Sequence, residues 1–173
     1  VLSGYIPDTE RVITIEDTAE LSLQGLPNLV RLEARLPGPD GTGEIGLGDL
    51  IRASLRMRPD RLIVGEVRGQ EAFDMLQAMN TGHPGSLCTG HAHSCQDVLD
   101  RLALMTLMAV QLPWAVIRGL MASALDLIVH LQRNRDGRRM VHEICSVNAV
   151  HEGQIKLNTL FSRNNKGALV YEE

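Results

Sequence analysis

The sequence predicts an α/β fold with a parallel sheet at its centre and an antiparallel extension in its C-terminal part. In the first half of the chain, short apolar segments with strand character alternate with helical segments, the order typical of a parallel sheet covered by helices. In the last third, strand-like segments follow one another with only turns between them, which favours antiparallel pairing. At 173 residues the chain is long enough for one compact domain with a buried core.

The first predicted strand spans residues 12–15, a continuous run of Val, Ile, Thr and Ile that suits a strand covered on both faces. Apolar and charged residues alternate over 29–36, which favours an edge strand with one face in solvent. Proline and glycine then mark a loop at 37–43, and a helix is expected over 47–57 before Pro59 ends it.

Further along, a second buried strand is expected at 62–64 and a third at 86–89, with an amphipathic helix over about 70–80 between them. A Leu- and Met-rich helix follows over 96–110, and Pro113 opens another helix at a position where proline is well tolerated. Late strands are expected over 126–131, 140–147 and 154–160.

Composition excludes several classes of protein. The chain carries 17 basic and 21 acidic residues, a formal charge of −4, so binding to nucleic acid by bulk charge is not expected. Its three cysteines are an odd number at wide spacing, which predicts reduced thiols rather than a disulfide framework. Polar residues interrupt the apolar stretch 102–131, so no membrane-spanning helix is expected there.

Polar residues with catalytic chemistry follow three of the predicted strands. Glu16 and Asp17 end the first, Glu66 and Arg68 follow the strand at 62–64, and His91 follows the strand at 86–89. The carboxyl ends of parallel strands meet at one edge of a sheet, so these side chains are expected to converge. Carboxylates there suit a hydrated Mg²⁺ or an oriented water, and arginine and histidine suit phosphate oxygens.

Three segments carry a family resemblance. Residues 13–21 resemble the Asp box of the secretion ATPases that drive type II and type IV secretion and assemble pili. Residues 62–69 resemble the Walker B strand of that family, and 81–93 resemble its His box. The resemblance runs in order from the first residue to about residue 161, and it implies that 1–173 are part of a RecA-like P-loop NTPase domain.

The resemblance also implies roles for individual residues. Glu16 and Glu66 would be catalytic carboxylates that act on the attacking water, and Glu66 and Asp17 would hold Mg²⁺ through water. ATP would be the nucleotide, contacted by Asp17, Arg68, His83 and His91. Arg31 and Arg35 either face the nucleotide of a neighbouring subunit in a hexameric ring or are solvated charges on an edge strand.

Two departures from the family pattern matter. The phosphate-binding motif G-x-x-x-x-G-K-[ST] occurs nowhere in the 173 residues, and residues 1–7 resemble the end of the helix that follows it. The chain is therefore expected to be the later part of a motor domain, without Walker A and without the family's N-terminal domain, and not to hydrolyse ATP alone. His93 stands where the family usually has Asn, so no role is assigned to it.

The full-length protein implied by the resemblance is a homo-hexamer. It would work with inner-membrane platform proteins of a secretion or pilus machine, from the cytoplasmic side and peripheral to the inner face of the membrane. The cargo, and the choice between secretion and pilus assembly, stay open.

Three alternatives compete with this interpretation. Gly41, Gly43 and Gly46 form a literal G-x-G-x-x-G with Glu66 twenty residues further on, which is the spacing of an NAD-binding domain. A zinc-binding module would use Cys88, His91, His93 and Cys95. The Leu- and Met-rich segment 96–121 would instead form a docking face in an interaction module, unless Leu102, Met105, Met108 and Leu112 simply cover the sheet.

Overall fold

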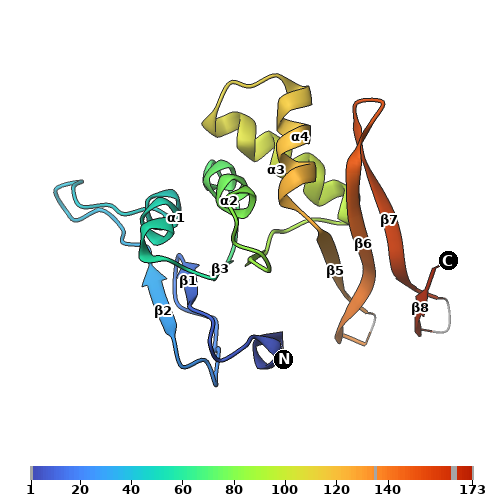
Figure 1. The fold of residues 1–173 in the computed structure, drawn as a ribbon, viewed down its shortest axis with the longest axis horizontal. Helices are drawn as coiled ribbons and strands as arrows, with labels where there is room; N and C mark the ends of the chain where they lie inside the picture. The colour runs from blue at the N-terminus through green and yellow to red at the C-terminus, as the bar shows by residue number, and fades with distance from the viewer. Residues whose placement is uncertain (1, 135, 165–166, 173) are drawn as a thin grey trace. The chain divides into compact units, whose positions relative to one another are not determined.

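The computed structural model describes residues 2–134, 136–164 and 167–172. The chain forms two compact units, residues 1–90 and 91–173, which are described one at a time (Figure 1).

The first unit contains the predicted parallel sheet. Its strand order is β2-β1-β3-β4, and every neighbouring pair is parallel. The strands are β1 (Val12–Glu16), β2 (Leu29–Glu33), β3 (Arg61–Val64) and β4 (Leu87–Cys88). All five residues of β1 are buried, as the β-branched run predicts for a strand covered on both faces. The alternating strand β2 lies at an edge, also as predicted.

Two helices cover one face of this sheet. The helices are α1 (Leu47–Ser54), extended by a 3₁₀ turn η2 (Leu55–Met57), and α2 (Glu71–Asn80). Ile51 of α1 and Met75 of α2 line a small internal space with Leu62 and Val64 of β3. The 3₁₀ turn ends because Arg58 adopts a left-handed conformation with φ 55°, and Pro59 cannot continue a helix.

The other face is covered by leucines from the loop between β1 and β2. Val12 and Ile63 form a buried cluster there with Ile6, which follows the short 3₁₀ helix η1 (Leu2–Tyr5). The partly buried residues packed against this cluster are Leu21, Leu23, Leu26 and Leu29. The sheet is thus the middle layer between α1 and α2 on one side and the leucine-rich loop on the other.

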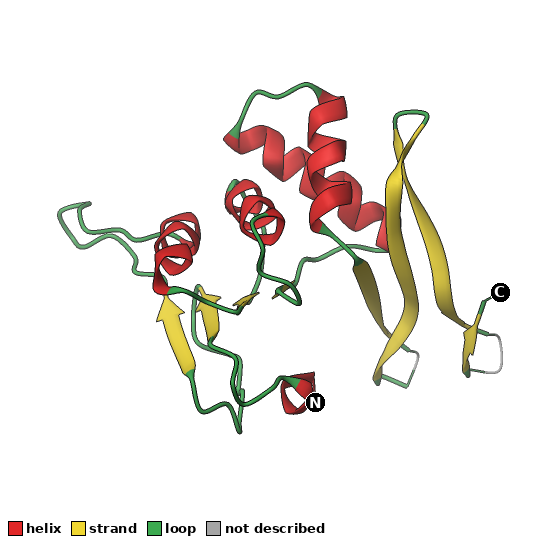
Figure 2. Ribbon diagram, in the orientation of Figure 1, coloured by secondary structure: helices red, strands yellow, loops and turns green. Residues whose placement is uncertain are grey.

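The second unit joins two helices to an antiparallel sheet. The helices α3 (Cys95–Ala109) and α4 (Trp114–Ala124) pack on the sheet, whose strand order is β5-β6-β7-β8 (Figure 2). The strands are β5 (Leu127–Arg133), β6 (Arg139–His151), β7 (Gln154–Arg163) and β8 (Leu169–Tyr171). The three longer strands match the predicted antiparallel extension. Strand β8 was not predicted, because three exposed residues give no periodic signal.

The helices of the second unit are only partly buried. Ser94 caps α3 by accepting a hydrogen bond from the Asp97 amide, and Pro113 precedes α4. Leu102 is buried, but Met108 is 69% exposed, so the expectation that Met108 covers the sheet is wrong.

Among the described residues no single helix has the length and apolar character to cross a membrane. Helices α3 and α4 meet that criterion only as a pair, and the pair is bent by 119° at its junction.

Truncating the core of the first unit should destabilise it measurably. Ile51 is fully buried between α1 and the sheet, so Ile51→Ala is expected to lower the free energy of unfolding by about 2–5 kcal/mol. Leu36→Ala is the matched control, since Leu36 is 85% exposed and its loss should change stability by less than about 0.5 kcal/mol. Urea denaturation measures both, and equal losses would contradict the assigned core.

Candidate functional site

Glu16 is a buried carboxylate at the carboxyl end of β1. It is the last residue of the strand and is only 5% exposed. Its Oε1 accepts hydrogen bonds from the backbone amides of Glu20 at 3.0 Å and Leu21 at 2.8 Å. Amide donors compensate the loss of water around a buried carboxylate. Glu16 therefore fixes the start of the β1–β2 loop against the edge of the sheet.

Gly65 provides the space that Glu16 occupies. It follows β3 directly, and its amide donates to the Ile15 carbonyl at 2.8 Å, so it extends the pairing of β3 with β1. A Cβ at this position would lie 3.0 Å from Cγ of Glu16. The absence of a side chain at residue 65 thus leaves room for Glu16 where the ends of β1 and β3 meet.

The loop that carries Glu66 is held from the β4 side. Val67 is buried, and its amide donates to the Thr89 carbonyl at 2.9 Å. The Thr89 hydroxyl in turn donates to the Gly65 carbonyl. Glu66 itself is half-buried between these anchored neighbours. Its backbone is therefore fixed at the carboxyl edge.

The same loop is also held from the helix that follows it. Oε1 of Glu71, in the first turn of α2, accepts from the amides of Arg68 at 2.7 Å and Gly69 at 2.8 Å. A carboxylate in the first turn of a helix also interacts favourably with the helix dipole. The sequence patterns predict no role for Glu71. The available signal was an acidic residue three positions after Arg68, at the start of an amphipathic helix.

Asp17 and Arg68 join the two strand ends through their side chains. Nη2 of Arg68 donates to Oδ2 of Asp17. Because the two side chains are 39% and 67% exposed, solvent screens the pair and its net worth is at most about 1 kcal/mol. The structure therefore brings together Glu16, Asp17, the Glu66 loop and Arg68, and we call this group the acidic rim.

The structure does not bring His83 to the acidic rim. The loop that carries it precedes β4 and contacts the start of β3: the Ser86 hydroxyl accepts from the Leu62 amide at 3.1 Å and donates to the His83 carbonyl at 2.8 Å. Arg61, the first residue of β3, donates to the Gly85 carbonyl at 2.8 Å. His83 thus lies at the amino edge of the sheet, opposite the acidic rim.

A backbone contact fixes the His83 ring. Its Nδ1 is 3.1 Å from the Ala78 carbonyl oxygen near the end of α2. A carbonyl oxygen can only accept, so Nδ1 carries the proton in this contact. The ring therefore caps α2. His91, the other histidine of the predicted site, is exposed and is the first residue of the second unit.

Arg31 and Arg35 both hold loops of the first unit. Arg31 donates from Nη1 to the Leu21 carbonyl and from Nη2 to the Leu23 carbonyl, each at 3.1 Å. Nε of Arg35 donates to the Gly43 carbonyl at 2.6 Å. Both guanidinium groups are thus engaged with local backbone at the β2 edge.

The glycine motif does not form a dinucleotide-binding turn. A single antiparallel bridge between Arg35 and Ile45 folds the intervening segment back on itself, and Gly41 and Gly43 have φ of 75° and 76° within it. A dinucleotide fingerprint instead turns directly from strand into helix. This loop separates β2 from α1, so the NAD-binding alternative has no structural basis here.

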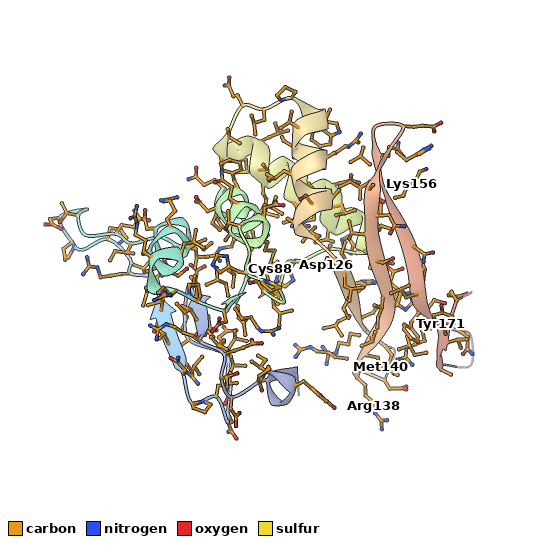
Figure 3. The ribbon with its side chains drawn as sticks, in the orientation of Figure 1. Cys88, Asp126, Arg138, Met140, Lys156 and Tyr171 are labelled. Atoms are coloured by element: carbon orange, nitrogen blue, oxygen red, sulfur yellow. The ribbon has the colours of Figure 1, made fainter. Side chains whose placement is uncertain are left out.

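The predicted zinc ligands are divided between the two units. Cys88, labelled in Figure 3, lies on β4 of the first unit, and burial raises the pKa of its thiol to about 11. Its three proposed partners, His91, His93 and Cys95, belong to the second unit. Within the described part of that unit, Cys95 joins a different group of potential metal ligands, and neither histidine is in it.

Comparison with known proteins gives a consistent result. A family described as "Type II/IV secretion system protein" matches residues 1–169. The type IV secretion system protein PtlH of Bordetella pertussis is 41% identical over 148 residues, which are 83% of this chain and 44% of PtlH. The type IV secretion system protein VirB11 of Brucella suis is 40% identical over 137 residues, 75% of this chain and 37% of VirB11.

A solved structure agrees with the sequence comparison. The crystal structure of the VirB11 ATPase from the Brucella suis type IV secretion system, in complex with sulphate, superposes with a TM-score of 0.73 at 38% identity. The match covers 84% of this chain and 42% of that one. The chain thus spans less than half the length of the curated relatives that it matches.

Removing the Glu16 carboxylate should expose its structural role. Glu16→Ala leaves the two loop amides without their acceptor, so it is expected to lower the free energy of unfolding by about 1–3 kcal/mol. Glu16→Gln should cost less, because its amide oxygen still accepts both hydrogen bonds. Chemical denaturation measures the free energy of unfolding of these variants, with Glu20→Ala as the exposed control. If Glu16→Ala loses no more of this free energy than the control, the carboxylate does not hold the loop.

Proposed function

We propose, from the premise that this chain belongs to the type II/IV secretion system protein family, that it supplies the catalytic carboxylates of an ATPase that powers secretion or pilus assembly. The observation that carries the proposal is the acidic rim. Two carboxylates and an acidic loop meet there at the carboxyl ends of adjacent parallel strands, where ligands of open α/β sheets bind.

The donor set of the rim fits Mg²⁺. This ion prefers oxygen ligands and keeps several of its waters, so one or two nearby carboxylates suffice to hold it. Asp17 and Glu66 are the residues that would hold it through water. When bound, Mg²⁺ neutralises charge that develops on phosphate oxygens.

Fixed backbone around Glu66 supports a catalytic role for that side chain. Its loop is tied through the Val67 and Arg68 amides, so little ordering remains when a nucleotide binds. In the proposed reaction Glu66 orients a water toward the γ-phosphate. Glu16 uses Oε1 to hold the loop, which leaves Oε2 as the oxygen for a water.

Arg68 provides the positive charge of the proposed site. One of its five N–H donors is committed to Asp17, and its side chain is largely exposed, so other donors are available to a phosphate oxygen. His83 is left out of this site, because it lies at the other edge of the sheet. His91 stays a proposed nucleotide contact on the strength of the family resemblance alone.

The residues of this chain fit the metal and water side of an ATP site, with Arg68 as a donor to phosphate. The phosphate-cradling motif does not occur in the 173 residues, so another segment must supply it. We place this chain in a homo-hexameric motor at the cytoplasmic face of the inner membrane, working with membrane-embedded platform proteins. Arg31 and Arg35 already donate to backbone carbonyls of their own loops, and they stay candidates for contact with a neighbouring subunit's nucleotide on the strength of the family resemblance alone.

The isolated chain should not hydrolyse ATP. Most of the phosphate-binding free energy resides in the cradle, so the 173-residue chain incubated with Mg²⁺ and ATP is expected to release phosphate at the background rate. A coupled phosphate-release assay measures this. Magnesium-dependent turnover that disappears in Glu66→Gln would contradict the expectation.

In a polypeptide that joins this chain to its phosphate-binding segment, Glu66→Gln should abolish turnover without abolishing nucleotide binding. Removal of a positioned carboxylate is expected to lower kcat by about 100-fold or more. Glu20→Gln, an exposed acid outside the rim, is the matched control and should retain full activity. Equal kcat in the two variants would refute a catalytic role for Glu66.

A further inference from the structure

The second unit contains a cluster of metal-ligating side chains that the secretion motor does not use. The ligand atoms of Cys95, Glu143 and Cys145 all lie within 4.8 Å of one another, and His130 lies beside them. We propose that this cluster binds a zinc ion, with the two thiolates and the Glu143 carboxylate as ligands and His130 as the fourth.

The fold places the four side chains on one side of the antiparallel sheet. Glu143 and Cys145 are two residues apart on β6, so they share a face. His130 of β5 is directly opposite Glu143 in the strand register and therefore shares that face too. Cys95 is the first residue of α3, which packs against these strands. Three separate elements thus converge at the cluster.

Direct contacts already connect the members. The Cys95 amide donates to Oε1 of Glu143 at 2.9 Å, which ties the start of α3 to β6. Nδ1 of His130 lies 3.5 Å from the same oxygen but makes no hydrogen bond within the described part of the chain. The His130 side chain is only 11% exposed. A metal ion bound here would give this buried ring nitrogen the partner that it lacks.

The thiols have only weak partners in the present arrangement. Sγ of Cys95 is 3.7 Å from the Ile128 carbonyl, and Sγ of Cys145 is 3.7 Å from the Thr159 hydroxyl. Burial raises the pKa of Cys95, and the neighbouring Cys145 and Glu143 raise it further. Without a cation the thiol is therefore neutral at physiological pH. A bound divalent ion reverses that balance, because a coordinating thiol is deprotonated.

The donor set selects zinc over the magnesium of the proposed ATP site. Thiolate and imidazole ligands suit zinc, whereas magnesium takes oxygen ligands. Metal–ligand lengths of about 2.0–2.3 Å place tetrahedral ligand atoms roughly 3.3–3.8 Å apart, so modest side-chain rotation brings the cluster to that geometry. Four protein ligands leave no open position, and such a site is structural: it would clip the start of α3 to β5 and β6.

The spacing of these residues explains why the sequence did not reveal the site. The four positions are 95, 130, 143 and 145, and they include no Cys-x-x-Cys pair. Spacing along the chain instead groups Cys95 with Cys88, His91 and His93. Only the strand register and the packing of α3 bring the correct partners to it.

Zinc titration of the untagged, fully reduced chain against a chromophoric chelator tests the proposal. The expected result is one zinc per chain and a higher Tm with zinc bound. Cobalt substituted for zinc should give a thiolate-to-metal charge-transfer band and the intense visible bands of a tetrahedral site. This spectrum comes from the unmodified chain, so the test does not depend on a variant that folds.

Variants identify the ligands. Cys145→Ser and Glu143→Gln should each weaken zinc binding by about 100-fold or more, and His130→Gln by about 10- to 100-fold. Cys88→Ser is the matched control, because Cys88 is a thiol outside the proposed set of ligands, and this variant should bind zinc as the unmodified chain does.

Four results would overturn the proposal. The first is that the unmodified chain binds no stoichiometric zinc and gives no thiolate–cobalt band. The second is that zinc binding survives Cys145→Ser, and the third is that it is lost in Cys88→Ser. The fourth is that the reduced chain binds no zinc and forms a Cys95–Cys145 disulfide on oxidation. The last would identify the two thiols as a redox pair instead.

Discussion

A buried carboxylate at the end of a central strand is the constraint on which the first unit depends. Glu16 has little access to solvent, so its charge requires hydrogen-bond donors, and the amides of residues 20 and 21 supply them. That requirement fixes the path of the β1–β2 loop, and it leaves little room for a side chain at Gly65, directly after the neighbouring strand β3. The position of the acidic rim follows from the way Glu16 is buried between the loop amides and Gly65.

Periodicity predicted the layered parallel sheet and most of its elements, because β-branched runs and amphipathic helices are local signals. Asp17 and Arg68 were predicted to lie together, since both follow parallel strands, and they form an ion pair. His83 shows the limit of that logic. His83 lies in the same motif as strand β4, residues 81–93. It precedes that strand, however, so it lies at the edge of the sheet opposite the acidic rim. Position before or after a strand decides which edge a motif residue occupies.

Tertiary contacts account for what the sequence could not predict. Glu71 organises the Glu66 loop through backbone amides, which leave no pattern in the sequence. The ligands of the proposed zinc site come from one helix and two strands whose register is not readable from composition. The acidic rim and the proposed zinc site also differ in chemistry: the partly exposed oxygen donors of Asp17 and Glu66 suit a hydrated, exchangeable ion, whereas buried sulfur donors suit a permanent one.

The most direct measurement is an experimental structure of the polypeptide that joins this chain to its phosphate-binding segment, with Mg²⁺ and a non-hydrolysable ATP analogue bound. We expect the carboxylates of Asp17 and Glu66 to contact waters of the metal beside the γ-phosphate. A nucleotide and metal bound at another edge of this sheet, with the Asp17–Arg68 pair intact and remote from them, would contradict this expectation.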